Sequence, residues 1–473
     1  MRLLKPDICV IGAGSGGLTV AAAAAAFGVS VVLVERGRMG GDCLNYGCVP
    51  SKALLASAKL AKRMRDASDV GLGTVEPGID FAAVNRHVHG VIDAIAPNDS
   101  VERFTALGVR VIQAEARFTD KRTVQAGDTE IRARRFVIAA GSSPQVPPIP
   151  GLDDVPYLTN ETIFDRKRLT RRLIIVGGGP IGLELAQAHR RLGAEVTVLE
   201  AGEILSREDR ELTALVRRRL VEEGVDIRED TKLARVEKRG NIVRAHLDQG
   251  GETAIVDGSH LLLATGRKAN VEGLGLKDAG IRFSPAGITV SSRLRTSNRR
   301  VYAIGDIAGG AQFTHLASFH AGIVLRAILF RLPARADRTV IPRVTFTDPE
   351  IAHVGLIETE ARASHRNVRV LRWPFAENDR AQTERQTEGH IKLVTDRRGR
   401  VLGASIAGAY AGEQIALWSL VVAKGMRVHD VAGLVLPYPT MSEIGKRASV
   451  SYFSGATAKP IVRRIIRFLR IFG

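Results

Sequence analysis

Two cysteines give this chain its clearest candidate for chemistry. Cys43 and Cys48 are separated by four residues in the stretch GGDCLNYGCVPSKALL, residues 40–55. Gly47 and Pro50 permit a bent entry into a helix, and such a bend brings two sulfurs within bonding reach. The N-terminus of a helix also stabilises a thiolate. The spacing therefore predicts a redox-active cysteine pair.

Two other interpretations of the pair stay open, a metal site and a pair of inert thiols. A structural zinc ion needs four ligands, and the neighbouring sequence offers neither a His nor a third Cys. The remaining cysteine, Cys9, lies in an apolar stretch and is expected in the core. Three cysteines in all favour a reducing, cytoplasmic compartment, in which a structural disulfide is disfavoured.

Two segments that follow one pattern must position this chemistry. Each has a short apolar stretch, the motif G-x-G-x-x-G, an Ala/Leu-rich stretch, a glycine, a second apolar stretch and a glutamate. The two segments are residues 7–37 and residues 172–202. The first glycine and the acid are 23 residues apart in both, Gly12 to Glu35 and Gly177 to Glu200. The repeat predicts two βαβ units and therefore two parallel sheets that bind dinucleotides.

The glycines of each motif have separate physical tasks. Gly12 makes the tight turn, Gly14 lets the backbone approach a pyrophosphate, and Gly17 lets the helix pack closely on the strand. The helix N-terminus then offers free N–H groups to the phosphates. The matching glycines of the second segment are Gly177, Gly179 and Gly182.

The acid that ends each unit bears on which nucleotide binds. Glu35 is expected to accept hydrogen bonds from a ribose. Glu200 is expected to pair with a ribose 2′-hydroxyl and to repel a 2′-phosphate. No arginine follows until Arg207, so NADH is preferred over NADPH.

Composition fits a large globular chain of about three to four domains. Its 473 residues are 45% hydrophobic and 25% charged, which excludes disordered, collagen-like and disulfide-scaffold classes. We expect neither a membrane span nor a secretory signal. The net charge of +18 is spread along the chain, and no nucleic-acid module with stacking aromatics is present. We therefore expect no nucleic-acid partner.

The order of the motifs strongly resembles the class I pyridine nucleotide–disulfide oxidoreductases. A dinucleotide loop, C-x-x-x-x-C-V-P-S-K, a second dinucleotide loop and Gly305-Asp306 follow one another. This family includes glutathione reductase, dihydrolipoamide dehydrogenase and mercuric reductase, and the resemblance covers roughly residues 5–453. It implies a homodimeric FAD enzyme of α/β class, with two Rossmann-like dinucleotide-binding domains and a C-terminal α+β dimerisation domain.

The resemblance also implies roles for individual residues. Cys43 resembles the interchange thiol that faces substrate, and Cys48 the charge-transfer thiol against the flavin. Lys52 resembles the lysine beside the flavin N5, with Glu184 as its ion-pair partner, because a buried ammonium needs a carboxylate. The residues implied to bind FAD and the nicotinamide nucleotide are Gly12, Gly14, Gly17, Glu35, Gly141, Asp306, His315, Gly177, Gly179, Gly182, Glu200 and Gly266. The implied reaction carries electrons from NADH through FAD to the cysteine disulfide, and the dithiol then reduces an acceptor.

The sequence departs from the family near its C-terminus. Glutathione reductase and dihydrolipoamide dehydrogenase carry His-Pro-x-x-x-Glu there. Glu443 keeps the spacing, but Tyr438 occupies the histidine position. The ordinary pKa of tyrosine is about 10, against about 6.5 for histidine, so Tyr438 is a poor base near neutral pH. We therefore expect weak exchange with lipoamide or glutathione.

The acceptor itself is open between several classes. Tyr438 and the stretch QFTHLASFHA, residues 312–321, resemble mercuric reductase, yet no cysteine follows Cys48 to receive the metal ion. A disulfide or a thiophilic metal ion is the leading expectation, with no resident metal site. The alternatives are an NADH-dependent quinone reductase of diaphorase type at the membrane surface, and dihydrolipoamide dehydrogenase. Asp42 also stands where these motifs often have Thr.

The chain ends in a basic amphipathic stretch, KPIVRRIIRFLRIFG, residues 459–473. Such a helix either lies on an anionic membrane, at the inner face, or docks on its own dimer. The expected domains are an FAD-binding domain at 1–150, an NAD(H)-binding domain at 151–270, a second FAD/central part at 271–337, a dimerisation domain at 338–455 and the tail at 456–473.

Overall fold

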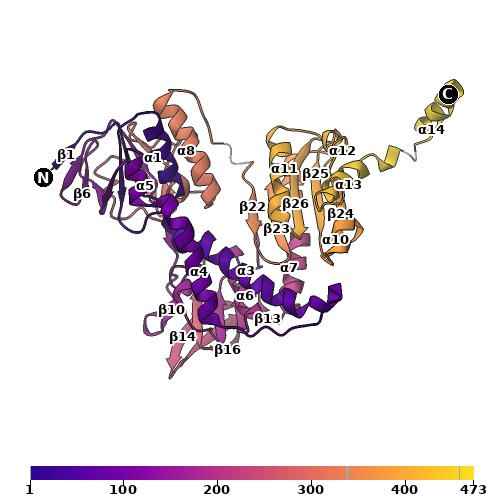
Figure 1. The fold of residues 1–473 in the computed structure, drawn as a ribbon, viewed down its shortest axis with the longest axis horizontal. Coiled ribbons are helices and arrows are strands. Elements are labelled where there is room, and N and C mark those ends of the chain that lie inside the picture. Colours follow the sequence, from indigo (N-terminus) through magenta and orange to yellow (C-terminus); the bar gives the residue numbers. More distant parts are fainter. Residues whose placement is uncertain (1, 337–339, 457–458) are drawn as a thin grey trace.

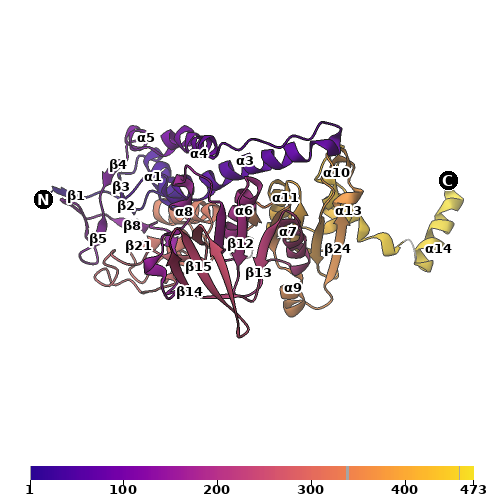
Figure 2. The ribbon, with the colours of Figure 1, turned by 90° about the horizontal axis from the view of Figure 1, so that it is seen from below.

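The computed structural model describes residues 2–336, 340–456 and 459–473. Figure 1 shows three bodies, each built on its own sheet. One body carries the N-terminus, the second lies below it in this view, and the third carries the yellow C-terminal elements. A last helix, α14, extends beyond the third body (Figures 1 and 2).

The first body is built on a parallel sheet with the strand order β21-β8-β2-β3-β4. Its strands are β2 (Ile8–Ile11), β3 (Val31–Glu35), β4 (Arg110–Gln113), β8 (Arg135–Ile138) and β21 (Val301–Ala303). The apolar run of β2 is buried throughout, as expected of a strand covered on both faces. Two helices, α1 (Ser15–Ala26) and α8 (Thr314–Leu329), pack against each other beside this sheet. Strand β21 thus returns residues near 300 to the N-terminal unit.

Smaller elements complete the first body. A second sheet has the order β1-β7-β6-β5, with the strands β1 (Arg2–Leu4), β5 (Ala116–Phe118), β6 (Val124–Ala126) and β7 (Thr129–Ile131). Two-stranded pairs join β9 (Ser142–Pro144) to β18 (Arg267–Ala269) and β19 (Phe283–Ser284) to β20 (Gly287–Ile288). The pairing of β9 with β18 ties the exit of the first unit to the exit of the second.

The second body repeats the parallel arrangement in the order β10-β17-β11-β12-β13. Its strands are β10 (Tyr157–Leu158), β11 (Arg172–Val176), β12 (Glu195–Leu199), β13 (Val225–Arg228) and β17 (His260–Leu263), and its helices are α6 (Pro180–Arg191) and α7 (Arg210–Glu222). An antiparallel meander, which the sequence analysis did not predict, is inserted before β17. It comprises β14 (Lys232–Arg239), β15 (Ile242–Gln249) and β16 (Glu252–Gly258).

The third body is an antiparallel sheet with helices, which agrees with the expected C-terminal α+β domain. Its strand order is β22-β23-β26-β25-β24. The strands are β22 (Arg343–Thr345), β23 (Glu350–Gly355), β24 (Arg369–Pro374), β25 (His390–Thr395) and β26 (Val401–Gly408). The helices are α9 (Glu358–Ser364), α10 (Asp379–Thr383), α11 (Ala411–Ala423), α12 (Val428–Ala432) and α13 (Glu443–Ser451).

Four helices begin in the cysteine stretch or follow it, and the longest of them, α3, links the bodies. They are α2 (Gly41–Asn45), α3 (Cys48–Arg65), α4 (Phe81–Ile95) and α5 (Val101–Ala106). Helix α3 packs on α4 and on α6 of the second body, and Figure 2 shows it running along the molecule toward the third. The expected α/β class is confirmed. Within the described ranges, no helix is long and apolar enough to cross a membrane.

Candidate active site

A single cleft of about 1460 Å³ brings the predicted residues together. Both glycine turns open into it, and so do the cysteine pair and the start of α8. The predicted residues that line it are Gly12, Gly14, Glu35, Cys43, Cys48, Lys52, Gly141, Gly177, Gly179, Glu184, Glu200, Gly266, Asp306 and His315. Gly17 and Gly182 do not line it. A Cβ on Gly17 would lie 1.9 Å from the Gly12 carbonyl oxygen, so Gly17 serves the close contact of helix and strand.

The two glycine turns have nearly the same geometry. Gly12 has φ +104° and Gly177 has φ +112°, a region open to glycine but not to other residues without strain. A Cβ at Gly12 would lie 2.4 Å from the Ala139 carbonyl oxygen, and a Cβ at Gly177 would lie 2.4 Å from that of Ala264. Both turns therefore require glycine, and both leave a helix N-terminus facing the cleft.

The two acids are held by the turns themselves. Glu35 accepts hydrogen bonds from the backbone N–H of Ala13 at 2.6 Å and of Gly37 at 2.7 Å. Glu200 accepts from Gly178 at 2.6 Å and from Gly202 at 3.1 Å. Each carboxylate is thus fixed at the end of its second strand, in the cleft, where the sequence predicts a ribose contact.

The cysteine pair lies where α2 meets the first residue of α3. Both thiols are free. A hydrogen bond from Cys43, the nearby Thr314 hydroxyl and the positive charge of Lys52 lower the pKa of Cys48 to about 6. The same hydrogen bond, together with burial, raises the pKa of Cys43. The two thiols are therefore electrostatically unlike: their surroundings favour the thiolate form of Cys48 and the protonated form of Cys43.

Lys52 and Glu184 form the predicted ion pair. Their Nζ and Oε2 atoms are 2.7 Å apart, and the Glu184 side chain is only 6% exposed. The other oxygen of Glu184 accepts the backbone N–H of Phe346 at 2.9 Å, and the Lys52 ammonium lies 4.4 Å from the centre of the Phe346 ring. One carboxylate of α6 thus joins α3 to the third body beside the cysteines.

A second polar chain crosses the cleft, and the sequence analysis missed most of it. Arg267 pairs with Asp42 at 3.1 Å and donates to the Ser142 hydroxyl at 2.7 Å. Ser142 in turn donates to Asp306 at 2.6 Å. Burial raises the pKa of Asp306, against this hydrogen bond. Arg267 directly follows the predicted Gly266, and this adjacency was the one feature of the sequence that could have indicated a role for Arg267.

The start of α8 contributes two neighbouring residues. Thr314 Oγ1 lies 3.5 Å from the Cys48 sulfur; the sequence analysis named only the adjacent His315. The His315 ring bonds the Pro342 carbonyl oxygen at 2.9 Å, and burial lowers its pKa despite that bond. Both side chains line the cleft, on the side of the cysteines.

Tyr438 and Glu443 do not reach the cleft of their own subunit. Tyr438 is 70% exposed and donates to an Asp379 carboxylate oxygen at 2.7 Å. This hydrogen bond raises the pKa of Tyr438. Glu443 accepts from the backbone N–H of Thr440 at 3.4 Å. The phenol is therefore further from acting as a base than an unperturbed tyrosine.

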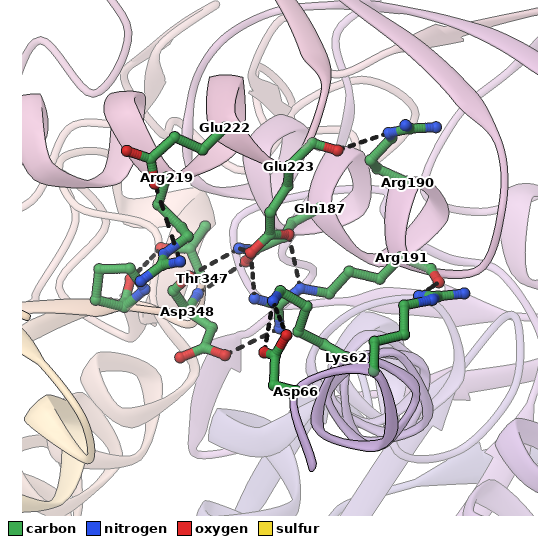
Figure 3. A network of polar contacts seen from close by, with 12 residues as sticks. Lys62, Asp66, Gln187, Arg190, Arg191, Arg219, Glu222, Glu223, Thr347 and Asp348 are labelled. Carbon is green, nitrogen blue, oxygen red and sulfur yellow. Dashed lines mark hydrogen bonds and ion pairs between the residues drawn. The ribbon is translucent and has the colours of Figure 1, made fainter. Parts of the chain in front are cut away.

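A buried network fixes α6 to its neighbours (Figure 3). Arg191 lies between Glu223 at 2.6 Å and Asp348 at 3.0 Å. Gln187 exchanges two 2.8 Å hydrogen bonds with the backbone of Asp348, and Arg65 of α3 donates to the Arg191 carbonyl oxygen. The helix that carries Glu184 is thus anchored to both α3 and the third body.

The donors and the space of the cleft fit two dinucleotides. Its two glycine turns present helix N-termini, and each is followed by a carboxylate at the end of the next strand, where the sequence predicts a ribose contact. No group of three or more His, Cys, Asp or Glu side chains that could hold a metal ion occurs in the described part of the chain.

Family models match most of the chain. Residues 6–321 match the pyridine nucleotide-disulphide oxidoreductases, and residues 341–449 match the dimerisation domain of the same family. The mercuric reductase of Lysinibacillus sphaericus is 34% identical over 94% of this chain and 82% of its own length. The dihydrolipoyl dehydrogenase of Geobacillus stearothermophilus is 33% identical over 94% of this chain and 96% of its own.

Solved structures resemble the fold throughout. The HOCl-induced flavoprotein disulfide reductase RclA of Escherichia coli, as its Cu(II) complex, superposes with a TM-score of 0.84 at 29% identity, over 93% of this chain and 98% of that one. LpdA of Mycobacterium tuberculosis superposes with a TM-score of 0.87 at 26% identity, over 95% of this chain and 99% of that one.

Proposed function

The chain belongs to the pyridine nucleotide–disulphide oxidoreductases, and we propose that it passes electrons from NADH through FAD and the Cys43–Cys48 pair to a disulfide or a thiophilic metal ion. With a disulfide acceptor, NADH, one proton and the disulfide yield NAD⁺ and two thiols. With a divalent metal ion, NADH and the ion yield NAD⁺, a proton and the metal reduced by two electrons. The observation that carries the proposal is that one cleft brings the two cysteines, both glycine turns and the Lys52–Glu184 ion pair together.

The first glycine turn and its surroundings would hold FAD. Gly12, Gly14 and Glu35 would receive the pyrophosphate and a ribose, and Asp306 and Gly141 line the cleft beyond them. FAD supplies the relay of an electron pair between a nicotinamide and the thiols. The second turn, through Gly177, Gly179 and Glu200, would hold the nicotinamide nucleotide, and Gly266 borders that part of the cleft.

The two cysteines and the ion pair beside them differ in charge, and the charge of each group determines its proposed role. Cys48 holds a thiolate, because its hydrogen bond from Cys43 and the ammonium of Lys52 favour the negative form. Cys43 keeps its proton and is the thiol offered to an acceptor. Glu184 holds Lys52 in place. Reduction of an acceptor disulfide would begin when the Cys43 proton passes to the Cys48 thiolate, its hydrogen-bond partner, and the Cys43 sulfur then attacks.

The relatives include both mercuric reductases and dihydrolipoyl dehydrogenases. One solved relative is a Cu(II) complex of a disulfide reductase, which supports a thiophilic metal ion as an acceptor. The raised pKa of Tyr438 counts against fast exchange with lipoamide, which needs a base at that position. We further propose a homodimer formed through the third body, in a reducing cytoplasmic compartment.

An anaerobic NADH titration tests the electron path. The purified flavoprotein should take up about two equivalents, one for FAD and one for the cysteine disulfide, with a long-wavelength absorbance band from the Cys48 thiolate. The variants Cys43→Ser and Cys48→Ser should take up about one equivalent, and Cys48→Ser should lack the band. Complete reduction of the native protein by one equivalent, without the band, contradicts the proposal.

A second candidate is quinone reduction of diaphorase type. It is favoured by the exposed Tyr438, since a quinone needs no thiol base. Steady-state assays of Cys43→Ser separate the two functions. Disulfide and metal-ion reduction should be lost in this variant, whereas quinone reduction should survive if quinone is the acceptor.

A further inference from the structure

The last described helix of the chain is largely exposed. Helix α14 (Pro460–Leu469) and the turn that follows it contain no buried residue, and Val462 alone among their apolar side chains is half-buried. The other large apolar side chains are between 52% and 75% exposed, namely Ile461, Ile465, Ile466, Phe468, Leu469, Ile471 and Phe472. Figures 1 and 2 both show α14 extending away from the third body. So large an exposed apolar surface indicates an interaction site.

The apolar and basic residues occupy separate faces of this helix. At 100° per residue, the apolar side chains from Ile461 to Phe472 fall within an arc of about 160°, with Ile471 outside it. The arginines fall together on the opposite side, and they are Arg463, Arg464, Arg467 and Arg470. Lys459 precedes the helix, and residues 459–473 contain no Asp or Glu.

The helix lies outside the part of the chain that the family models match. The dimerisation-domain match ends at residue 449, and α14 begins at Pro460. The shared dimer fold therefore does not require this helix. Ten helical residues span about 15 Å, too short to cross a bilayer core of about 30 Å.

Charge selects among the surfaces that could cover the apolar face. The whole chain carries +18 and residues 459–473 contain no acidic residue, so anionic lipid attracts the arginine face more strongly than a second copy does. We propose that α14 lies in the plane of an anionic lipid surface, with its apolar face among the acyl chains and its arginines at the headgroups. A homodimer presents two such helices, and their joint binding exceeds that of either one.

Vesicle sedimentation with the full-length, FAD-loaded protein tests this proposal. Binding to phosphatidylcholine vesicles that contain about 30% phosphatidylglycerol should be at least about tenfold stronger than to phosphatidylcholine alone. Arg464→Glu/Arg467→Glu should weaken it at least about tenfold, and Ile465→Ser/Phe468→Ser should weaken it by a similar factor. The matched control Arg293→Glu/Arg299→Glu changes two exposed arginines far from the tail and should bind as the native protein does.

Three results would overturn the proposal. The first is equal binding of the native protein to both kinds of vesicle, and the second is unchanged binding of Arg464→Glu/Arg467→Glu. The third is a native protein that binds neither vesicle while that variant loses the dimer in analytical ultracentrifugation. The last result would identify the second copy as the occupant. None of these measurements uses NADH oxidation, so failure here leaves the proposed electron path standing.

Discussion

The two glycine turns are almost the same, but the helices that follow them are not. Positions in the second unit are offset from those of the first by 165 residues, as Gly12 and Gly177 show. Both turns require glycine, and each acid accepts hydrogen bonds from the backbone N–H groups at corresponding positions of its own unit. From the first strand to the helix N-terminus, the backbones of the two units therefore have nearly the same conformation.

Beyond that point α1 and α6 differ in what they carry. Helix α1 reads SGGLTVAAAAAA and contains no charged residue. At the positions of Thr19, Ala22 and Ala26, helix α6 has Glu184, Gln187 and Arg191, all buried. These three side chains reach Lys52, Asp348 and Glu223.

The difference shows how one local motif serves two purposes. The turn determines how backbone meets a dinucleotide, because glycine geometry and free N–H groups are local properties. The helix determines what the unit is connected to. The first unit packs α1 on α8 through small residues, whereas the second uses buried charges to hold α3 and the third body in register.

Removing Arg191 should give the largest effect. Arg191→Ala copies the alanine of the first unit and leaves Glu223 and Asp348 without their buried partner. We expect a loss of about 3–5 kcal/mol in the free energy of unfolding, measured by urea denaturation. Arg190→Ala, which loses hydrogen bonds to backbone carbonyl groups only, is the control and should cost about 1 kcal/mol. Equal costs would contradict the special position of Arg191.

Alanine in the turns should separate the two cofactors. Gly177→Ala forces a side chain into φ +112° and against the Ala264 carbonyl, at a cost of about 2 kcal/mol. The KM for NADH should rise at least about tenfold, with FAD content unchanged. Gly12→Ala should instead lower FAD content, measured by flavin absorbance per protein. Loss of FAD from Gly177→Ala would show that the turns are not separate sites.

The two acids should also differ in which cofactor they affect: substitution of Glu200 should change the preference between NADH and NADPH, and substitution of Glu35 should not. The effect should be smaller than that of alanine in the turns. Glu200→Ala removes the carboxylate that we propose repels a 2′-phosphate, so the ratio of kcat/KM for NADPH to that for NADH should rise about tenfold. Glu35→Ala should leave this ratio unchanged. Steady-state kinetics with both nucleotides measure the ratio. An unchanged ratio in Glu200→Ala would exclude this acid as the determinant.

The smallest effect is expected where the two units meet. Lys52→Met removes the ammonium that α6 holds beside Cys48. Since that positive charge helps to lower the pKa of Cys48 to about 6, the thiolate should appear only at higher pH in the variant. In the reduced protein, the long-wavelength absorbance band from the Cys48 thiolate should weaken several-fold at pH 6, with little change at pH 9. If the pH at which half of Cys48 is thiolate were the same in the variant as in the native protein, the Lys52 charge would be excluded as a cause of the lowered Cys48 pKa.

Local motifs were predictable, and contacts between distant residues mostly were not. The turns, the cysteine stretch, the α/β class and the helical tail follow from spacing and periodicity. The Lys52–Glu184 pair came from the family resemblance. Ser142 and Asp306, by contrast, are 164 residues apart, and nothing in either stretch marks the other. The meander of β14, β15 and β16 was missed because it is inserted within a unit that already matched a complete pattern.

The sequence by itself determined which groups can react and which turns can receive a dinucleotide. Residue type sets the chemistry of Cys43 and Cys48, and glycine spacing sets the backbone path. Only the tertiary structure decided that the two thiols are unlike. The pKa of Cys48 depends on Thr314 and Lys52, and Lys52 is held by Glu184 from a third segment. Electrostatic interactions act through space, so their partners are fixed only when the sheets have brought distant segments together.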